Sequence, residues 1–301
     1  MLRLFELIRI AAATRSPVLI LGETGTGKEL VAQAIHETGP CRKEPFVPVD
    51  CPALAPTLIE SELFGYVRGA FTGAVSDKMG LLSSAGRGTL FLDEIAELTP
   101  ELQARLLRVI ETNEFKPVGS TCRVPFKARI LAATHRNLAS AVRERSFRED
   151  LYFRLNVHSI TLPPLRERKT DIPLLAEKLL VELSATGRIT CESALVLSPE
   201  VLDRLLEYKW PGNVRELRNV LERAAAWARD SVIRDNDLSL DLQLNDPRAE
   251  YHSSQNVIPL QESERQAILR AISACHGNKI LAARLLGIGK TTLYRKLRTY
   301  R

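Results

Sequence analysis

The chain has 301 residues, 45% of them apolar and 26% charged, with 42 Lys and Arg against 36 Asp and Glu. This composition excludes a disordered chain, and no run of 18 or more apolar residues offers a membrane-spanning helix. The five cysteines are odd in number and include no Cys-x-x-Cys pair. This pattern argues against a disulfide framework or a zinc site and favours the reducing cytoplasm.

The positive charge is concentrated at the C-terminal end. Residues 259–301 contain nine Lys or Arg and two Glu, a net charge of +7, whereas the first 258 residues sum to −1. A basic segment beside a nearly neutral body indicates a polyanionic partner for that segment alone.

Short β-like runs alternate with helical patterns over residues 1–162, which predicts an α/β subdomain with βαβ units around a mostly parallel sheet. The predicted strands are Val18–Leu21, Phe46–Asp50, Thr89–Asp93, Arg129–Thr134 and Val157–Leu162.

The β pattern stops after Pro163 and Pro164, and apolar residues then recur at helical spacing. We expect a helical subdomain over 163–240, a polar linker over 241–258 and a small all-α domain over 259–301. The predicted helices of these parts are Ile172–Leu183, Pro199–Tyr208, Asn213–Arg229, Gln261–Ala274, Ile280–Leu286 and Lys290–Leu297.

A glycine-rich motif follows the first strand. The segment GETGTGK matches G-x-x-x-x-G-K and precedes a predicted helix at Glu29–Glu37. Glycines let successive backbone N–H groups face an anion, the helix N-terminus adds positive potential, and the lysine reaches the outer phosphates of ATP. The alternative is a glycine-rich turn with a solvated lysine. The predicted nucleotide-binding residues are Gly22, Glu23, Thr24, Gly25, Thr26, Gly27, Lys28 and Glu29.

Two carboxylates follow a later strand. Glu29 stands where the generic motif has a Mg²⁺-binding Ser or Thr, so Mg²⁺ must depend on other oxygens. Asp93 and Glu94 lie at the strand end where α/β sheets bind ligands. We expect Asp93 to hold Mg²⁺ through water and Glu94 to polarise the attacking water. Thr134, at the end of another strand, is placed to sense the γ-phosphate. The alternative for each is an ordinary strand-end side chain.

A hexapeptide carries the most specific pattern. Residues Gly69–Ala74 read GAFTGA and follow the block ESELFG, which ends at Gly65. With these motifs the chain resembles, over about residues 1–301, the sigma-54-dependent transcriptional activators, which are bacterial enhancer-binding proteins of the AAA+ class. The resemblance implies an AAA+ P-loop domain with a helical lid. Other matching blocks are Gly22–Glu29, Gly88–Ile95, Phe147–Val157, Leu162–Arg168 and Trp210–Leu217.

The resemblance implies that GAFTGA tips a mobile loop that contacts the sigma factor when ATP is bound. Phe71 suits such docking as an exposed aromatic anchor, and the alternative is a glycine-bounded turn with Phe71 in the core. Asn113–Val124 would be the neighbouring second loop. The expected contact residues are Gly69, Ala70, Phe71, Thr72, Gly73 and Ala74.

Three arginines match functional positions of the family. Arg148 and Arg154 match the arginine fingers, which a neighbouring subunit supplies to the γ-phosphate. The resemblance therefore implies a composite site in a homo-oligomeric ring, most simply a hexamer. Arg215 matches a lid arginine that senses the nucleotide. From the residues alone, each arginine has a structural ion pair as its alternative.

Two positions depart from the family pattern. Asp50 stands where the family commonly has an Asn that holds Glu94 inactive until the partner is engaged. An ionised Asp cannot donate a hydrogen bond to Glu94, and two neighbouring carboxylates raise the pKa of one of them. The switch would then work differently in this chain. Tyr66-Val67-Arg68 replaces the more usual His-Glu-Lys before GAFTGA, so a charged loop contact is expected to be missing.

The segment from Asn278 to Leu297 has a helix-turn-helix pattern and resembles the Fis-type C-terminal domain of these activators. Gly287 allows the turn, and Ile288, Leu293 and Leu297 would seal the helix pair. The alternative is a charged helix pair with no nucleic-acid role. The residues expected to face enhancer DNA are Lys290, Thr291, Thr292, Tyr294, Arg295 and Lys296.

We expect a ring-forming ATPase, bound to enhancer DNA, that converts the closed sigma-54 RNA polymerase complex into the open complex. The alternatives are a nucleotide-gated DNA-binding regulator that needs no hydrolysis and a different AAA+ remodelling protein. Intact Lys28, Asp93 and Glu94 argue against the first, and GAFTGA argues against the second. Because the phosphate loop begins at residue 22, we expect control by an N-terminal domain that has been removed or by a separate partner.

Overall fold

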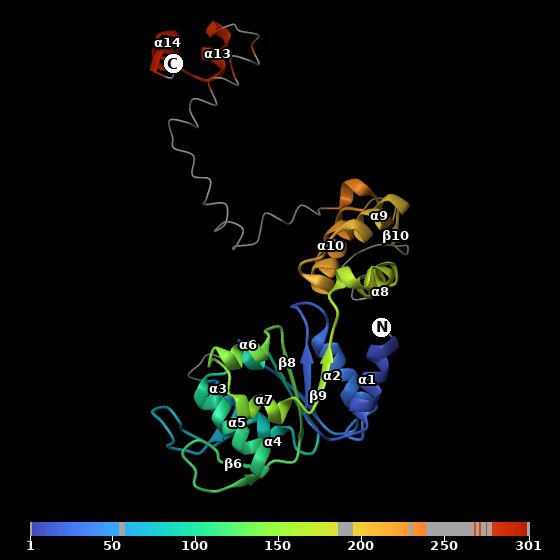
Figure 1. Ribbon diagram of the computed structural model, residues 1–301, viewed down its shortest axis with the longest axis vertical. Coiled ribbons are helices and arrows are strands. Elements are labelled where there is room, and N and C mark those ends of the chain that lie inside the picture. The colour runs from blue at the N-terminus through green and yellow to red at the C-terminus, as the bar shows by residue number, and fades with distance from the viewer. Residues whose placement is uncertain are drawn as a thin grey trace. The chain divides into compact units, whose positions relative to one another are not determined.

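The computed structural model describes residues 2–53, 58–185, 195–228, 231–238, 268, 271, 275 and 279–299. The chain forms two compact units, Met1–Ser239 and Leu240–Arg301 (Figure 1). The predicted linker over 241–258 and most of the predicted helix Gln261–Ala274 lie outside the described residues. Within the described ranges, no helix combines the length and the apolar character that crossing a bilayer requires.

The first unit is built on a five-stranded parallel sheet, which confirms the predicted α/β class. Its strands are β1 (Val18–Leu21), β2 (Phe46–Asp50), β5 (Thr89–Asp93), β8 (Arg129–Thr134) and β9 (His158–Thr161). They lie in the order β2-β5-β8-β1-β9, so β5 and β8 are direct neighbours. All five predicted strands are present. The central strands β1, β5 and β8 are apolar runs, as strands covered on both faces require, whereas the edge strand β9 reads His-Ser-Ile-Thr and buries only Ile160.

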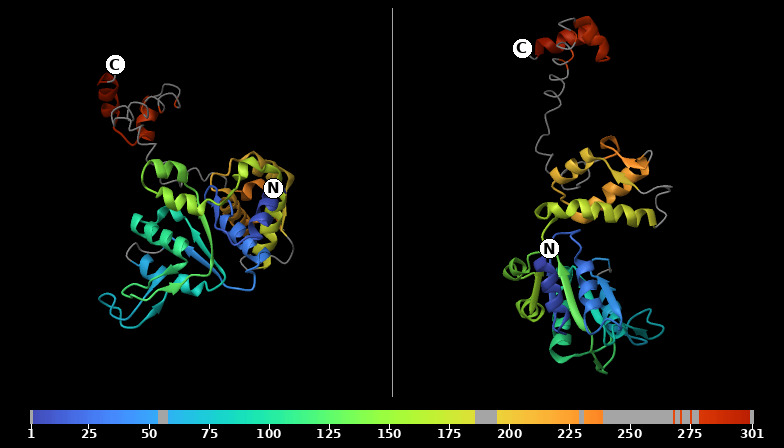
Figure 2. Two further views of the ribbon diagram at one scale, coloured as in Figure 1. Left: turned by 60° about the horizontal axis from the view of Figure 1, so that its bottom comes forward. Right: turned by 90° about the vertical axis from the view of Figure 1, so that its right-hand side faces the viewer.

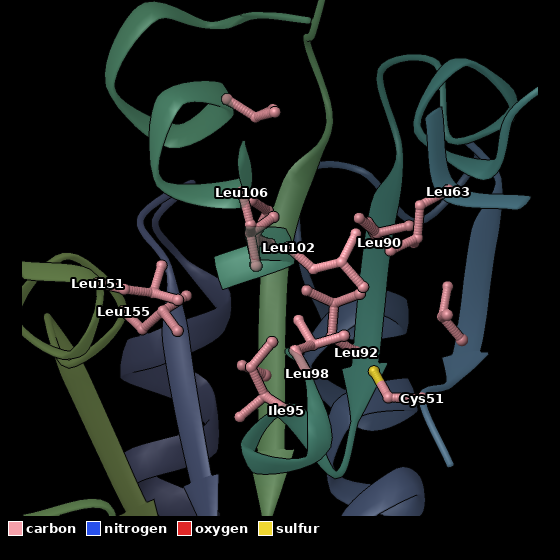
Figure 3. Close-up of a cluster of buried hydrophobic side chains, with 14 of the residues drawn as sticks. Cys51, Leu63, Leu90, Leu92, Ile95, Leu98, Leu102, Leu106, Leu151 and Leu155 are labelled. Carbon is pink, nitrogen blue, oxygen red and sulfur yellow. The ribbon is translucent and has the colours of Figure 1, made fainter. Parts of the chain in front are cut away.

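Alternate side chains of the strands enter two separate cores, because successive residues of a strand point to opposite faces. Leu19 joins the first core, whereas Val18 and Ile20 join the second. In the first core, Leu102 and Leu106 lie over the sheet (Figure 3). That core is covered by α3 (Ile59–Phe64), α4 (Leu81–Ser84), α5 (Pro100–Thr112), α6 (Leu138–Arg143) and α7 (Glu149–Leu155), and the second by α1 (Leu2–Ala12) and α2 (Lys28–Thr38).

Helix α5 has clear local reasons for its ends. Thr99 Oγ1 accepts a hydrogen bond from the Leu102 backbone N–H at 3.5 Å, and Pro100 occupies the first turn, where its missing N–H costs nothing. Asn113 ends the helix with φ 54°, a left-handed conformation that Asn tolerates. The helix therefore runs from the turn after β5 to the start of the predicted second loop.

The lid subdomain contains α8 (Ile172–Ala185), α9 (Pro199–Glu207) and α10 (Asn213–Trp227), close to the predicted helices (Figure 2). Trp210 is fully buried, and its Nε1 donates to the Leu205 carbonyl at 2.8 Å. The expectation that β structure ends at Pro164 is wrong in one detail. β10 (Val196–Leu197) and β11 (Val232–Ile233) form a parallel pair. Two-residue strands are too short for an alternating pattern to be read from sequence.

The second unit contains α13 (Lys279–Leu285) and α14 (Lys290–Thr299) among its described residues. Gly287 has φ 65°, which favours glycine at the turn between them. Leu293 is fully buried in a small core with Ile268 and Ala283, and Ile288 packs against it. The predicted helix-turn-helix is therefore present, while the side chains of Tyr294 and Leu297 lie outside the described atoms.

Candidate functional site

The phosphate loop connects β1 to α2 and has the backbone that its glycines allow. Gly25 has φ 79° and Gly27 has φ 98°, both in the left-handed region that glycine adopts without steric cost. Thr26 Oγ1 donates to the Glu23 carbonyl at 2.7 Å, which closes the loop on itself. Gly27 directly precedes α2, so the loop ends at a helix N-terminus, where anions are stabilised.

The lysine of the motif is not solvated. Lys28 is 6% exposed, and its Nζ lies 3.1 Å from the Gly22 carbonyl and 3.2 Å from Glu94 Oε1. Glu29, the next residue, is exposed in the first turn of α2. A buried ammonium group needs a partner, and Lys28 has a carboxylate and a carbonyl. This geometry excludes the alternative of a glycine-rich turn with a solvated lysine.

The start of lid helix α10 clamps the phosphate loop. Asn213 is buried with φ 54°; its Nδ2 donates to the Thr24 carbonyl at 3.0 Å and its Oδ1 accepts from the Leu165 N–H at 2.8 Å. The Arg215 backbone N–H donates to the Gly25 carbonyl at 3.3 Å, while the Arg215 side chain is exposed. A rigid contact therefore joins the lid to the loop.

A glycine is required at this contact. A Cβ on Gly25 would lie 2.3 Å from the Gly212 carbonyl oxygen, so any side chain would separate the lid from the loop. The sequence analysis assigned a role to Arg215 but none to Asn213. The sequence offered only an Asn at the start of a predicted helix. Its burial and its contacts, which show that it joins the lid to the phosphate loop, appear only in the structure.

Two further arginines attach the segment after β9 to the phosphate loop. Arg166 forms two hydrogen bonds with the Glu23 carboxylate, at 2.8 and 2.5 Å, and Arg168 Nη2 donates to the Thr26 carbonyl at 3.0 Å. The hydrogen bonds from Arg166 outweigh partial burial and lower the pKa of Glu23. Glu23 thus fixes the loop, and the sequence analysis missed both arginines within the block Leu162–Arg168.

Asp93 ends β5 beside the phosphate loop. Its Oδ1 accepts the backbone N–H of Glu94 at 3.0 Å. Burial raises the pKa of Asp93, the charges of Glu94 and Asp50 raise it further, and the charge of Lys28 opposes them. No cluster of three or more His, Cys, Asp or Glu side chains around one point occurs among the described residues. A single carboxylate with substrate phosphates is a usual donor set for Mg²⁺, so Asp93 fits that ion.

Glu94 has donors at both carboxylate oxygens. Besides Lys28 at Oε1, its Oε2 accepts from Thr134 Oγ1 at 3.2 Å, from the His135 N–H at 3.1 Å and from His135 Nδ1 at 2.7 Å. Burial alone would raise the pKa of Glu94, but hydrogen bonds from His135 and the charge and hydrogen bond of Lys28 lower it overall. Adjacent carboxylates in one turn therefore have pKa values shifted in opposite directions. His135 was not among the predicted site residues.

Asp50 lies in register with Asp93 on the neighbouring strand and is exposed. No hydrogen bond joins it to Glu94 in the described part of the chain. Its charge contributes to the raised pKa of Asp93, whereas the pKa of Glu94, the carboxylate that Asp50 was expected to repel, is lowered.

The two arginines that match arginine fingers lie on α7 and face solvent. Arg148 precedes the helix and makes two hydrogen bonds to Asp150, at 3.0 and 2.7 Å. Arg154 Nη2 lies 3.6 Å from Glu111 Oε1, and its side chain is 61% exposed. Solvent screens exposed ion pairs of this kind and they contribute little to stability, so the structure requires neither arginine for the fold.

GAFTGA forms the tip of a hairpin between β3 (Gly65–Tyr66) and β4 (Lys78–Met79). Gly69 and Gly73 have φ 79° and 107°, and the Gly69 N–H donates to the Ala74 carbonyl at 3.0 Å. Phe71 is 43% exposed and packs edge-on against Tyr66, with ring centroids 5.0 Å apart. Phe71 is therefore not a core residue.

The second loop lies against this hairpin. It follows β6 (Glu114–Phe115) and precedes β7 (Val124–Pro125). The Val67 N–H donates to the Val118 carbonyl at 3.1 Å, and a Cβ on Gly119 would lie 2.7 Å from the Ala70 Cβ. The two loops therefore form one surface, as the neighbouring position of Asn113–Val124 predicts.

In the second unit, α14 carries the residues expected to contact DNA. Lys290, Thr291 and Arg295 are exposed, and Thr292 and Lys296 are half-buried. Leu293 on the opposite side of α14 fills the small core.

The fold and site define a P-loop protein of the AAA+ class with a helical lid and a C-terminal helix-turn-helix. Residues 1–161 match the Sigma-54 interaction domain family, residues 166–255 the AAA+ ATPase lid domain, and residues 259–300 the Fis family of bacterial regulatory proteins. The chain therefore belongs to the family of sigma-54-dependent transcriptional activators.

Named relatives agree with this assignment. The chain is 44% identical over 290 residues to the transcriptional regulatory protein ZraR of Klebsiella oxytoca, covering 96% of this chain and 65% of that protein. It is 45% identical over 302 residues to the Nif-specific regulatory protein of Azotobacter vinelandii, covering 99% and 57%. The chain thus spans about two thirds or less of the length of these relatives.

A solved structure shares the whole described architecture. NtrX from Brucella abortus superposes with a TM-score of 0.80 at 32% identity, covering 99% of this chain and 67% of that one. A structure of the same protein in complex with ATP matches with a TM-score of 0.79.

Proposed function

We propose that this chain is an ATPase that assembles into a ring, most simply a hexamer, and couples ATP hydrolysis to opening of the sigma-54 RNA polymerase complex at promoters while bound to enhancer DNA. The observation that carries the proposal is the 3.2 Å pair between Lys28 and Glu94, at the carboxyl end of the sheet and beside the lid. A phosphate-binding lysine beside a water-activating carboxylate is the minimal equipment for hydrolysis of a γ-phosphate.

The phosphate loop binds the nucleotide in this proposal. Backbone N–H groups of residues 22–27 face the phosphates, and Lys28 leaves Glu94 to bind the outer ones. Arg215 reaches the nucleotide from the lid, since its backbone is already bonded to Gly25 and its side chain is exposed. Thr134 lies where the γ-phosphate is sensed.

Asp93 would hold Mg²⁺ together with the substrate phosphates, and the ion would neutralise phosphate charge when bound. Glu94 accepts the proton of the attacking water once its present donors release it. Arg148 and Arg154 of one subunit stabilise the γ-phosphoryl charge in the site of the next subunit, which makes the active site composite.

Mixing two inactive variants tests the composite site. Lys28→Ala removes the phosphate lysine, and Arg154→Ala removes the arginine of the neighbouring subunit. In a mixed ring, some sites pair an intact phosphate loop with an intact Arg154, and random assembly restores about one quarter of the wild-type rate. Steady-state ATP hydrolysis measures the recovery. No recovery, together with a wild-type specific activity that is independent of protein concentration, would contradict a ring.

The GAFTGA hairpin contacts sigma-54 in this proposal, and the second loop supports it. Exposed Phe71 and Thr72 at its tip offer an aromatic anchor and a hydroxyl for docking. The reaction places the protein in the cytoplasm with the polymerase.

The helix-turn-helix binds enhancer DNA, with exposed Lys290 and Arg295 on α14 available to bases or phosphates. Each phosphate contact adds about one to the slope of log affinity against log salt. We expect Lys290→Gln to weaken binding and to reduce this slope by about one, measured by fluorescence anisotropy across a salt series. An unchanged slope would show that Lys290 does not contact a phosphate.

A further inference from the structure

The contacts of Glu94 suggest a restraint on hydrolysis. Lys28 Nζ lies 3.2 Å from Oε1, while Thr134 Oγ1 and two donors of His135 converge on Oε2. A carboxylate activates water by accepting a hydrogen bond and then a proton, so donors already in place compete with that water. The residue that would activate water is therefore occupied by its own protein.

Asp50 does not supply this restraint. It lies in register with Asp93, is exposed, and makes no hydrogen bond to Glu94 among the described residues. The donors to Glu94 Oε2 come instead from Thr134 at the end of β8, the direct neighbour of β5 in the sheet, and from His135 directly after it. The strand order thus brings His135 to Glu94 from the side opposite to Asp50.

The ring of His135 is the donor in its contact. Glu94 pairs with the ammonium group of Lys28 at 3.2 Å, as a carboxylate does, and carboxylate oxygens only accept hydrogen bonds. The Nδ1 atom 2.7 Å away must then carry the proton. Hydrogen bonds to an ionised carboxylate at this distance are among the stronger ones in proteins.

The surrounding contacts keep the two residues together. Arg136, which follows His135, pairs with Glu97 at 2.7 Å, so the segment after β8 is tied to the turn after β5 at a second point. Glu94 itself has φ 52°, a conformation that non-glycine residues rarely adopt. Its carboxylate contacts hold it in that conformation.

The two restraints on Glu94 respond differently to a nucleotide. Lys28 is a phosphate ligand, so a bound triphosphate competes directly for its ammonium group. His135 lies on the segment after β8, and its bonds to Glu94 do not depend on Lys28. We infer that His135 is a positioning residue. It keeps Glu94 hydrogen-bonded, and so away from the attacking water, after the nucleotide has bound Lys28. Asp50 does not fill this role. The inference rests on the proposed ATPase activity.

Three variants test this role in the full chain without sigma-54. His135→Ala removes the ring donor, whereas His135→Asn keeps an amide donor near the Nδ1 position. Lys43→Gln alters an exposed lysine after α2 and serves as the control. We expect His135→Ala to raise kcat for ATP about tenfold, the effect of losing one charge-assisted hydrogen bond, with KM unchanged. His135→Asn and Lys43→Gln should remain close to wild type.

A kcat of His135→Ala at or below the wild-type value, in a protein that unfolds at the wild-type temperature, overturns the inference. An equal rise in His135→Asn overturns it as well, because the donor is retained. A crystal structure of wild type with Mg²⁺ and a non-hydrolysable ATP analogue gives an answer that needs no turnover. Glu94 still bonded to His135 while Lys28 binds phosphate supports the restraint, and Glu94 released from both residues contradicts it. Absence of any wild-type hydrolysis would count against the proposed function, and this structure would still decide the restraint.

Discussion

Lys28 in the phosphate loop is almost fully buried and bonded to a carbonyl and a carboxylate, whereas Phe71 at the tip of the GAFTGA hairpin is 43% exposed and packs edge-on against Tyr66. The phosphate loop, Asp93 and Thr134 lie at the ends of parallel strands, where pairing of the strands fixes their positions. The hairpin projects beyond the sheet on strands of two residues each. The side chains of the charged site are thus held by many bonds, whereas Phe71, which we propose docks on a partner, is held by few.

Removing the central charge of the nucleotide site should have the largest effect. Lys28→Ala deletes the ammonium group that binds the outer phosphates, so we expect ATP hydrolysis to fall by at least about 100-fold. Steady-state hydrolysis and nucleotide binding by calorimetry measure the loss. Lys43→Ala, an exposed lysine after α2, is the matched control and should remain at the wild-type rate.

A change at the tip of the hairpin should leave ATP hydrolysis intact and abolish open-complex formation. Thr72 is exposed between Phe71 and Gly73, and its removal leaves the core untouched. We expect Thr72→Ala to keep ATP hydrolysis within about twofold and stability within about 0.5 kcal/mol, but to lose ATP-dependent open-complex formation on a sigma-54 promoter. Loss of hydrolysis together with open-complex formation would mean that the hairpin also builds the nucleotide site.

The strands and the phosphate loop were predictable from sequence because they are local. Val18–Leu21 and Arg129–Thr134 are apolar runs of strand length, and buried parallel strands need no other pattern. The glycines of the phosphate loop indicate positive φ values directly, and Gly25 and Gly27 have them.

The contacts that join distant segments were not predictable. Asn213 bonds a loop 189 residues earlier in the chain, and His135 meets Glu94 only because β8 pairs with β5. Neither the packing of the lid on the loop nor the order of strands leaves a periodic pattern in the sequence. The departure from the family pattern at Asp50 was visible in the sequence, whereas the contact between His135 and Glu94 was missed for the same reason.

The lid contact allows a sharper test of the buried region. Asn213→Ala loses the bonds to Thr24 and Leu165 and also forces alanine to φ 54°, whereas Asn213→Gly loses only the bonds. We expect the free energy of unfolding to fall by about 3 kcal/mol for alanine and about 2 kcal/mol for glycine. Urea unfolding measures both. Equal losses would show that the left-handed conformation carries no cost, and no loss for glycine would show that the amide does not stabilise the lid.

The smallest expected effect separates two adjacent carboxylates. The pKa of Asp93 is raised by burial, so its ionisation destabilises the folded protein as pH rises above the ordinary value of 3.8, and this loss is complete above the folded pKa. The pKa of Glu94 is lowered by its hydrogen bonds, so its ionised form stabilises the fold above the ordinary value of 4.5, and this contribution disappears as pH falls through the folded pKa.

Neutral isosteres should therefore act in opposite directions. At pH 7 we expect Asp93→Asn to be slightly more stable than wild type and Glu94→Gln to be less stable, although both variants lose ATP hydrolysis. The difference should vanish below the ordinary value of 3.8 for Asp93 and below the folded pKa for Glu94, because the carboxyl is then neutral in the folded and the unfolded protein. Thermal unfolding from pH 3 to pH 8 follows both differences. If both variants change the unfolding temperature in the same direction, the stability of the turn after β5 depends on its total charge. The hydrogen bonds of His135 and Lys28 would then not make Glu94 different from Asp93.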